Sequence, residues 1–545
     1  LRIGGRGSWH YGGKSMQTCT GAAAKQSNAA PAFMSRIRVS LIVLACVLIG
    51  PLELASSRCG HAYVAILAGQ RARPLNGDFN NVPVLHSNQP EIVTGPGILV
   101  NTAPGAAIAS ENNRPLNNAT YTFNGEFGVH MHHKYYPSDV SKLGGSRSRG
   151  LLTLALIAAN PGQKSVTLRF KRGSVKNSFE APYHSNKLMG VKPLGKRPWN
   201  TGPGDATAVQ LLRNELDRKV PDSVTIPAGG RVVIVRTILP ARGIANGLLQ
   251  GHSDGPFTMA VVASDQTSSD QDLFTVLDHG RLAPGRIYLN RIREIQLGRV
   301  FSRVAGVALG DEYRASINHD LTQGALHVPL TSTSRHHFGT RDIQVNPLAV
   351  RMIDSALNNI GTYGVRYSVT LNLVGNGNYQ LVMSHPVISG KQPFTAFRGS
   401  MQIEQKNTMQ EIHVGLRSGE SLALTDINLL EDQNTPVKVT LVYPADATPG
   451  HLLSVVPVDQ LTVLRRRQLQ QRTAQQNITI KKTNAVAPKT PPPLPEIQQK
   501  VPIKPVLSLQ PSIMVPKSSS PPTNDPRYTD ANRSQQQWLR QLQGR

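Results

Sequence analysis

The body of this sequence lacks cysteine. Only three of the 545 residues are cysteines, Cys19, Cys46 and Cys59, and all three lie near the start of the chain. Disulfide frameworks and cysteine-based zinc sites need several cysteines at defined spacings, so both are excluded for the rest of the chain. A body free of thiols is also typical of exported proteins, in which a stray thiol risks unwanted oxidation.

Aromatic and acidic residues are scarce as well. Aromatics make up 5% of the chain, which argues against a surface built from stacking platforms. The 59 Lys and Arg residues outnumber the 33 Asp and Glu residues, which gives a formal net charge of +26. Such a balance favours polyanionic partners. Because net charge governs association rather than fold, a solvated basic surface without a dedicated partner remains the alternative.

No apolar run is long enough to cross a membrane as a helix, which needs about 20 residues. The run VSLIVLACVLIG at 39–50 follows Arg36 and Arg38 and precedes several small residues, the order found in secretory signal peptides. We therefore expect 1–33 to be a disordered upstream extension, with the start at Met34. Residues 34–71 form the signal region, and no transmembrane span remains after its removal. A signal anchor or a buried core helix is the alternative.

Residues 72–463 alternate short β-like runs with turns rich in Gly, Pro and Asn. The runs Leu151–Ala159 and 367–374 are examples, rich in Val, Leu, Ile and Thr. The turns at 160–162 (NPG) and 375–378 (GNGN) predict hairpins. Only 206–218, 270–278 and 350–360 look helical, the first with Asp205 as its N-cap and Pro221 as its stop. Many strands and few helices predict a mainly β fold built from β-sandwiches.

A weak internal repeat divides the body in two. The first half carries a strand, a turn, a strand, an insert and then VTIPAGGRVVIV. The second half carries YSVTLNLVGNGNYQLVMS, an insert and then IHVGLRSGESLALT. We predict two tandem β-sandwich-like domains, 72–295 and 296–463, although coincidence between two β-rich stretches would give the same pattern.

The composition changes after residue 463. Residues 464–545 hold 14 Lys and Arg against 3 Asp and Glu, with a Pro- and Gln-rich sequence. Such a segment buries too little apolar surface to fold. We therefore expect a basic, disordered C-terminal tail.

Short motifs are spread in order along residues 72–458. They are RPL from Arg73, NVPV from Asn81, SNQPE from Ser87, GIL from Gly97, His132-His133, NP from Asn160, IPAG from Ile226, RVAGVA from Arg303 and YPADATP from Tyr443. Together they resemble a cyanobacterial family of secreted proteins known only as a domain of unknown function. The resemblance implies export in a cyanobacterium. It implies no activity and therefore assigns no catalytic residues.

One segment, GHSDG at 251–255, fits the G-x-S-x-G pattern of serine hydrolases. That nucleophile elbow needs a strand before the serine and a helix after it. Here Pro256 and a strand-like run follow Ser253, which favours a polar, Gly-rich loop. We assign no catalytic residue and predict no cofactor.

Three histidines, His130, His132 and His133, form the densest imidazole cluster. On a strand His130 and His132 would share a face and could chelate a metal ion, with His336 and His337 as further candidates. No HExxH motif is present. The alternative is histidines that bond to backbone carbonyls or to water.

Basic residues gather around one predicted hairpin, the following loop and the start of the tail. They are Lys164, Arg169, Lys171, Arg172, Lys176, Lys187, Lys192, Lys196, Arg197, Arg465, Arg466 and Arg467. Lys and Arg recognise phosphate, sulfate and carboxylate groups. In an exported protein such groups belong to anionic envelope polysaccharide or lipid, whereas nucleic acid is out of reach.

These observations lead to two hypotheses. The first is an exported, non-enzymatic structural or binding protein of the cell envelope or extracellular space, tethered by its tail to anionic polymers. It would reside in the periplasm, on the outer surface or in the medium. The second is an enzyme that acts on envelope polymers, metal-assisted through the three histidines.

Overall fold

The computed structural model describes residues 72–88, 92–144, 149–183, 188–386, 393–431, 433–445 and 447–460, and a few single residues from 462 to 473. The predicted upstream extension, the signal region and nearly all of the predicted tail lie outside the described residues. Within the described part, no helix is both long and apolar enough to cross a membrane.

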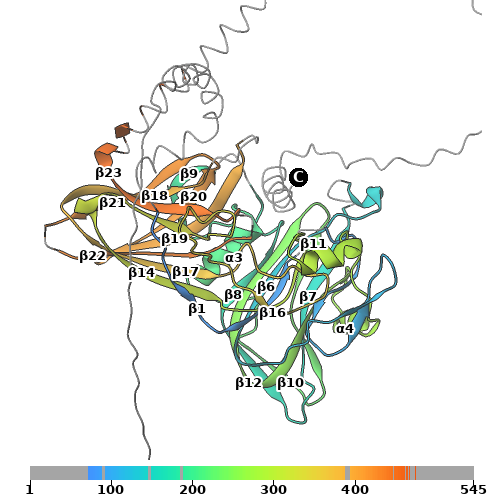
Figure 1. The fold of residues 1–545 in the computed structure, drawn as a ribbon. Coiled ribbons are helices and arrows are strands. Elements are labelled where there is room, and N and C mark those ends of the chain that lie inside the picture. The colour runs from blue at the N-terminus through green and yellow to red at the C-terminus, as the bar shows by residue number, and fades with distance from the viewer. Residues whose placement is uncertain are drawn as a thin grey trace, which may run out of the picture. The chain divides into compact units, whose positions relative to one another are not determined.

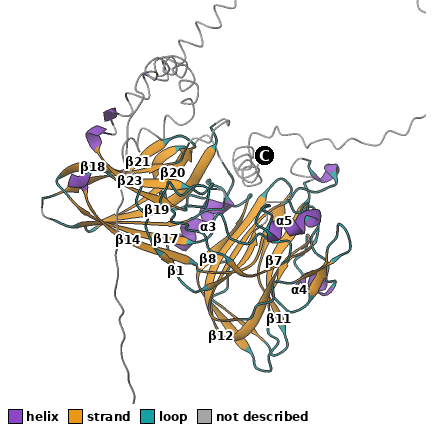
Figure 2. Ribbon diagram, viewed as in Figure 1, coloured by secondary structure: helices purple, strands orange, loops and turns teal. Residues whose placement is uncertain are grey.

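Strands dominate the described part of the chain (Figures 1 and 2), which confirms the predicted mainly β class. The larger sheet contains β2 (Pro83–Asn88), β3 (Gly97–Asn101), β6 (Phe123–Lys134), β7 (Leu151–Ala159), β8 (Val166–Asn177), β10 (Ser223–Ile226), β11 (Arg231–Pro240), β12 (Ile244–Asp265), β13 (Val304–Leu309) and β16 (Leu348–Arg351). A separate short hairpin joins β4 (Ala106–Ile108) to β5 (Pro115–Asn117).

Two further sheets enclose a second core. The seven-stranded sheet contains β1 (Asp78–Phe79), β9 (Gly190–Pro193), β14 (Glu312–Asp320), β17 (Arg366–Val374), β19 (Thr395–Gln405), β20 (Thr408–Arg417) and β22 (Thr435–Val442). The four-stranded sheet contains β15 (Leu326–Leu330), β18 (Gly377–Ser384), β21 (Ser421–Leu429) and β23 (His451–Pro457). Leu371 of β17 and Leu381 of β18 belong to one buried cluster, so the two sheets pack as a sandwich.

The long strand β12 holds the larger sheet together. Its first part pairs with β6 and β8, and its second part pairs with β3 and β7, with a register break between Ser253 and Phe257. Gly251 lies just before the break, where a Cβ atom would come within 2.7 Å of the Phe127 ring. GHSDG is therefore a strand segment with a bend rather than the Gly-rich loop that we expected, and no helix follows Ser253.

Strands from each half of the chain complete the sheets of the other half. β13 pairs with β2 at one side of the larger sheet, and β16 pairs with β13 beyond it. In return, β9 pairs with β20, and β1 pairs with β14, in the seven-stranded sheet. The division into domains at 295/296 stays a prediction, and strand pairs cross it in both directions.

The described residues include the helices α3 (Pro203–Leu212), α4 (Asp270–Asp278) and α5 (Ile292–Gln296) and the single turns η1 (Val140–Lys142), η3 (Leu289–Arg291) and η4 (Leu321–Gln323). Residues 458–460, directly after β23, are helical as well. The predicted helix 270–278 is confirmed as α4, capped by Ser269. The predicted helix 206–218 is shifted: α3 begins at Pro203, a favoured first residue, and Asn214 follows its end with a φ of 58°. The helix predicted at 350–360 is wrong, since its first residues belong to β16.

Both turns that we expected to close hairpins connect strands that do not pair with each other. NPG links β7 to β8, which each pair with β12 but not with one another. GNGN links β17 of the seven-stranded sheet to β18 of the four-stranded sheet. NPG thus connects two strands that pair with different parts of β12 within the larger sheet, whereas GNGN carries the chain from one sheet of the sandwich to the other.

Candidate functional site

The three histidines of the predicted metal site lie on β6, in the interior of the larger sheet, and all are buried. His130 Nδ1 lies 3.3 Å from Nδ1 of His86 on the neighbouring strand β2. His132 Nδ1 donates to Oδ1 of Asn246 at 2.9 Å, and His133 Nε2 lies 2.9 Å from Ser87 Oγ. Each imidazole therefore has its own side-chain partner.

Burial makes the imidazoles of His86, His130 and His133 hard to protonate. Removal from water lowers the pKa of His86 to about 3 and holds the pKa of His130 and of His133 well below the ordinary value of 6.5. Neighbouring histidines lower both pKa values further. Neutral imidazole is the form that binds metals. However, the described residues contain no group of three or more His, Cys, Asp or Glu placed to hold a metal ion, so the metal site stays a prediction.

Of the predicted basic residues, Lys164 precedes β8, and Arg169, Lys171, Arg172 and Lys176 lie on it. Lys164 and Arg169 are exposed, as is Lys171, whose Nζ lies 2.6 Å from Glu126 Oε1. By contrast, Arg172 bonds Gln250 and Asn214, and Lys176 pairs with Asp217. The last two cations are therefore held by intramolecular partners.

The loop after β9 adds two exposed cations, Lys196 and Arg197. The loop reaches the far end of β8, because Nζ of Lys176 lies 5.4 Å from the ring centroid of Trp199. Lys192 is exposed on β9. Lys187, Arg465 and Arg467 lie outside the described residues, and Arg466 is helical and exposed. We call the exposed residues Lys164, Arg169, Lys171, Lys196 and Arg197 the basic track.

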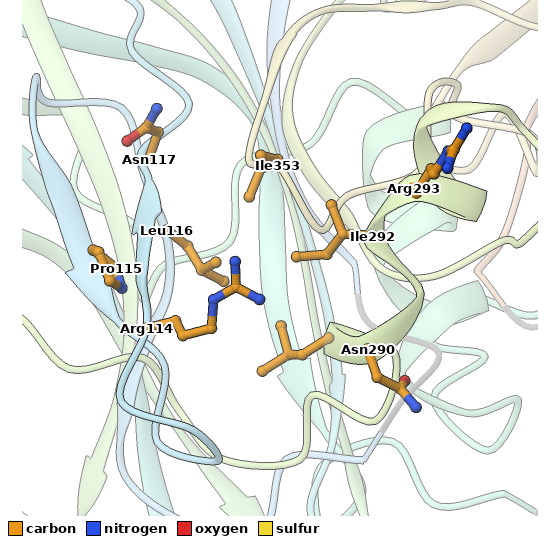
Figure 3. A pocket seen from close by; sticks show the side chains of 9 residues that line it. Arg114, Pro115, Leu116, Asn117, Asn290, Ile292, Arg293 and Ile353 are labelled. Carbon is orange, nitrogen blue, oxygen red and sulfur yellow. The ribbon is translucent and has the colours of Figure 1, made fainter.

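A separate hollow lies between the β4–β5 hairpin and the segment η3–α5, with a volume of about 330 Å³. Sequence reasoning gave no sign of it. Its lining residues are Arg114, Pro115, Leu116, Asn117, Leu289, Asn290, Ile292, Arg293 and Ile353. Figure 3 shows Ile292 and Ile353 pointing into the hollow and the guanidinium of Arg114 lying across it, while Arg293 stands at the rim. The hollow thus combines apolar walls with two cations.

Two other hollows, of about 540 and 560 Å³, lie on the outer face of β14 and β17. In the hollow of about 560 Å³, Arg314 pairs with Glu312 at 2.7 Å, and Lys438 pairs with Glu404 at 3.1 Å. In the hollow of about 540 Å³, Arg73 bonds His319 and the carbonyl of Asn318, and Asp320 also lines the wall. They present a polar, charge-balanced surface, unlike the hollow beside β5.

Sequence reasoning also missed a buried cluster where α3 packs on β19 and β20. Asp205 Oδ2 lies 3.2 Å from both His413 Nδ1 and Ser400 Oγ, and that hydroxyl lies 3.3 Å from the same Nδ1. A catalytic triad needs the serine and the carboxylate on opposite ring nitrogens. Because both contacts here meet Nδ1, the cluster fits a structural role in fixing α3.

Comparisons with known proteins identify a family but no activity. A family profile described as "Protein of unknown function (DUF3370)" matches residues 70–457. No curated protein matches the chain. Among solved structures, the chain shows a distant likeness to the CUB1-EGF-CUB2 domain of human MASP-1/3. The two share 9% identity over 56% of this chain and 92% of the other, with a TM-score of 0.15, which is too low to carry an argument.

Proposed function

Since the chain belongs to the DUF3370 family of proteins of unknown function, we propose a role from its own residues: an exported protein that binds linear anionic polymers of a cyanobacterial envelope. The β body would bind such a polymer along the basic track, and the basic tail would act as a tether. The periplasm, the outer surface and the medium are the places where such polymers occur.

The observation that carries this proposal is the placement of exposed cations near both ends of β8. Lys164 lies at one end, and Lys196 and Arg197 lie at the other; none of the three forms an ion pair with a described carboxylate. A strand of this length spans roughly 40 Å at about 3.3 Å per residue. Cations spread over that distance suit an extended polymer better than a small ion.

An enzymatic role has weaker support in the geometry. The histidines that the second hypothesis needs are buried within the sheet. Ser253 lies in the middle of β12, where its hydroxyl is 3.0 Å from the backbone nitrogen of Gly125 and serves as the acceptor. Binding therefore accounts for the exposed chemistry better than catalysis does.

The test is the binding of the full chain to immobilised dextran sulfate, with neutral dextran as the comparison. We expect salt-sensitive binding to dextran sulfate alone, because salt screens exposed charges. Exposed ion pairs contribute about 0.2–1 kcal/mol each, so the triple variant Lys164→Gln, Lys196→Gln, Arg197→Gln should weaken binding about three- to hundredfold. The control Lys406→Gln removes an exposed cation from the β19–β20 turn and should change little. If the triple variant and the control weaken binding equally, the proposal that the polymer binds along the basic track is refuted.

The tail is tested separately by removing residues 464–545 and measuring retention in isolated cyanobacterial envelope fractions. Loss of retention with intact dextran sulfate binding would assign the tether to the tail and polymer binding to the body. Full retention of the truncated chain would refute the tether.

A further inference from the structure

The hollow beside β5 brings two cations together with apolar walls, and no acidic side chain lies among its lining residues. Glu294, the nearest acid in sequence to Arg293, is bonded by Arg291, whose Nε lies 3.0 Å from Oε2. Neither Arg114 nor Arg293 forms an ion pair with a described carboxylate. The hollow is therefore positively charged as well as partly apolar.

The frame of the hollow is firmly held. The Ile108 nitrogen donates to the carbonyl of Gly280 at 2.7 Å, which ties the hairpin to the chain before η3. Glu111 Oε1 accepts from the backbone nitrogens of Gly285 and Arg286 at 2.6 and 2.7 Å, and thereby fixes the hairpin loop. Leu116 and Leu289 are buried beneath the hollow. A site held in this way is largely formed before a ligand arrives.

We propose that this hollow binds a small amphipathic anion, a molecule with a carboxylate or phosphate head and an apolar body. The guanidinium of Arg114, which lies across the hollow in Figure 3, would receive the head. A planar guanidinium offers paired N–H donors that match the oxygens of such groups. Ile292 and Ile353, which point inward, would cover the apolar body. This site is independent of the basic track.

The volume limits the size of the ligand. At about 30 Å³ per water-sized group, the hollow of about 330 Å³ holds roughly ten non-hydrogen atoms. It lies at the lower end of the range for small-molecule sites, about 300–1,000 Å³. Octanoate, with its eight carbons and two oxygens, is a probe of matching size and chemistry.

The experiment is calorimetric titration of the full chain with octanoate, octyl phosphate, octanamide and acetate. Octanamide keeps the size and shape of octanoate without the charge, and acetate keeps the charge without the apolar body. We expect one saturable site for octanoate or octyl phosphate, and binding at least tenfold weaker for octanamide and for acetate. The stronger of the two anions identifies the head group.

Variants locate the site. Arg114→Gln should weaken octanoate binding by about tenfold or more, because a hydrogen bond to a charged group is lost. Ile292→Ser should weaken octanoate while leaving acetate unchanged. The matched control Arg218→Gln removes an exposed cation elsewhere and should have no effect. The proposal is overturned by absence of saturable binding, by equal binding of octanamide and octanoate, or by octanoate binding that neither Arg114→Gln nor Ile292→Ser reduces.

Discussion

Acid should unfold this protein well above the pH at which carboxylates titrate. The reason is a set of histidines that burial keeps neutral in the folded state, each with a pKa below 6.5. They are His86, His130, His133, His327, His336, His385 and His451. In the unfolded chain each would return to a pKa of about 6.5.

The sign of the effect follows from proton uptake. Above pH 6.5 these histidines are neutral in both the folded and the unfolded chain, so they do not reduce the free energy of unfolding. As the pH falls below 6.5, protons bind to these histidines in the unfolded chain but not in the folded protein. The difference persists until the pH reaches the pKa of the histidine in the folded protein. Stability is therefore lost over the window from 6.5 down to the folded value, which is about 3 for His86 and His385 and about 4 for His327.

The magnitude can be worked for those three residues. At pH 5 each of these histidines is still neutral in the folded protein, whereas in the unfolded chain it is protonated. Since pH 5 lies about 1.5 units below the unfolded pKa, each histidine lowers the free energy of unfolding by about 2 kcal/mol. Three such residues remove about 6 kcal/mol, which is comparable with the whole stability of a typical domain, about 5–15 kcal/mol. The other four histidines of the set, His130, His133, His336 and His451, act in the same direction.

The assay is urea unfolding at pH 7.5 and pH 5.0. His327→Gln should recover about 2 kcal/mol of the loss, because the Gln amide can still bond Ser454, the hydroxyl partner of His327 Nδ1 at 2.8 Å. The exposed His279 is the control, and His279→Gln should leave the loss unchanged. Equal unfolding free energies at the two pH values, or uptake of less than one proton on unfolding at pH 5, would refute the reasoning.

Two further predictions concern stability at neutral pH. Asp354→Asn should destabilise the protein by about 3–5 kcal/mol in denaturant unfolding. The reason is that NH1 of the buried Arg286 lies 2.6 Å from Asp354 Oδ2 and would lose its charge partner. A loss below about 1 kcal/mol would contradict this. Gly173→Ala should destabilise by more than the about 1–2 kcal/mol expected for a left-handed backbone, since its new Cβ atom would lie 2.1 Å from the Leu248 carbonyl oxygen. Gly105→Ala, also at positive φ but with open space around it, is the control, and equal losses would rule out the clash.

The sequence predicts the strands and helices whose own residues decide them. β7 is a continuous apolar run, and it has the bounds that the sequence predicts. α4 has a Ser cap and acidic residues in its first turn, and it is also predicted residue for residue. By contrast, residues 350–360 resemble a helix, yet Val350 pairs with Val307 of β13. A strand partner distant in the sequence overrides local propensity there.

The candidate site was less accessible to sequence reasoning than the fold. Arg114 and Arg293 belong to different segments, and no spacing pattern links them before the chain folds. The basic residues of β8 were recognised, but sequence alone does not show that Arg172 and Lys176 are bonded internally whereas Lys164 is exposed. Which cations are available is decided by their neighbours in space.

The strand pairs that join the two halves of the chain affect how it folds. β2 needs β13, and β9 needs β20, so neither sheet can be completed while the later half of the chain is still missing. Pairings between such distant segments form slowly. The larger sheet therefore stays incomplete until β16 has been made, and the seven-stranded sheet stays incomplete until β22 has been made, so a newly made chain keeps unpaired strand edges through much of its synthesis.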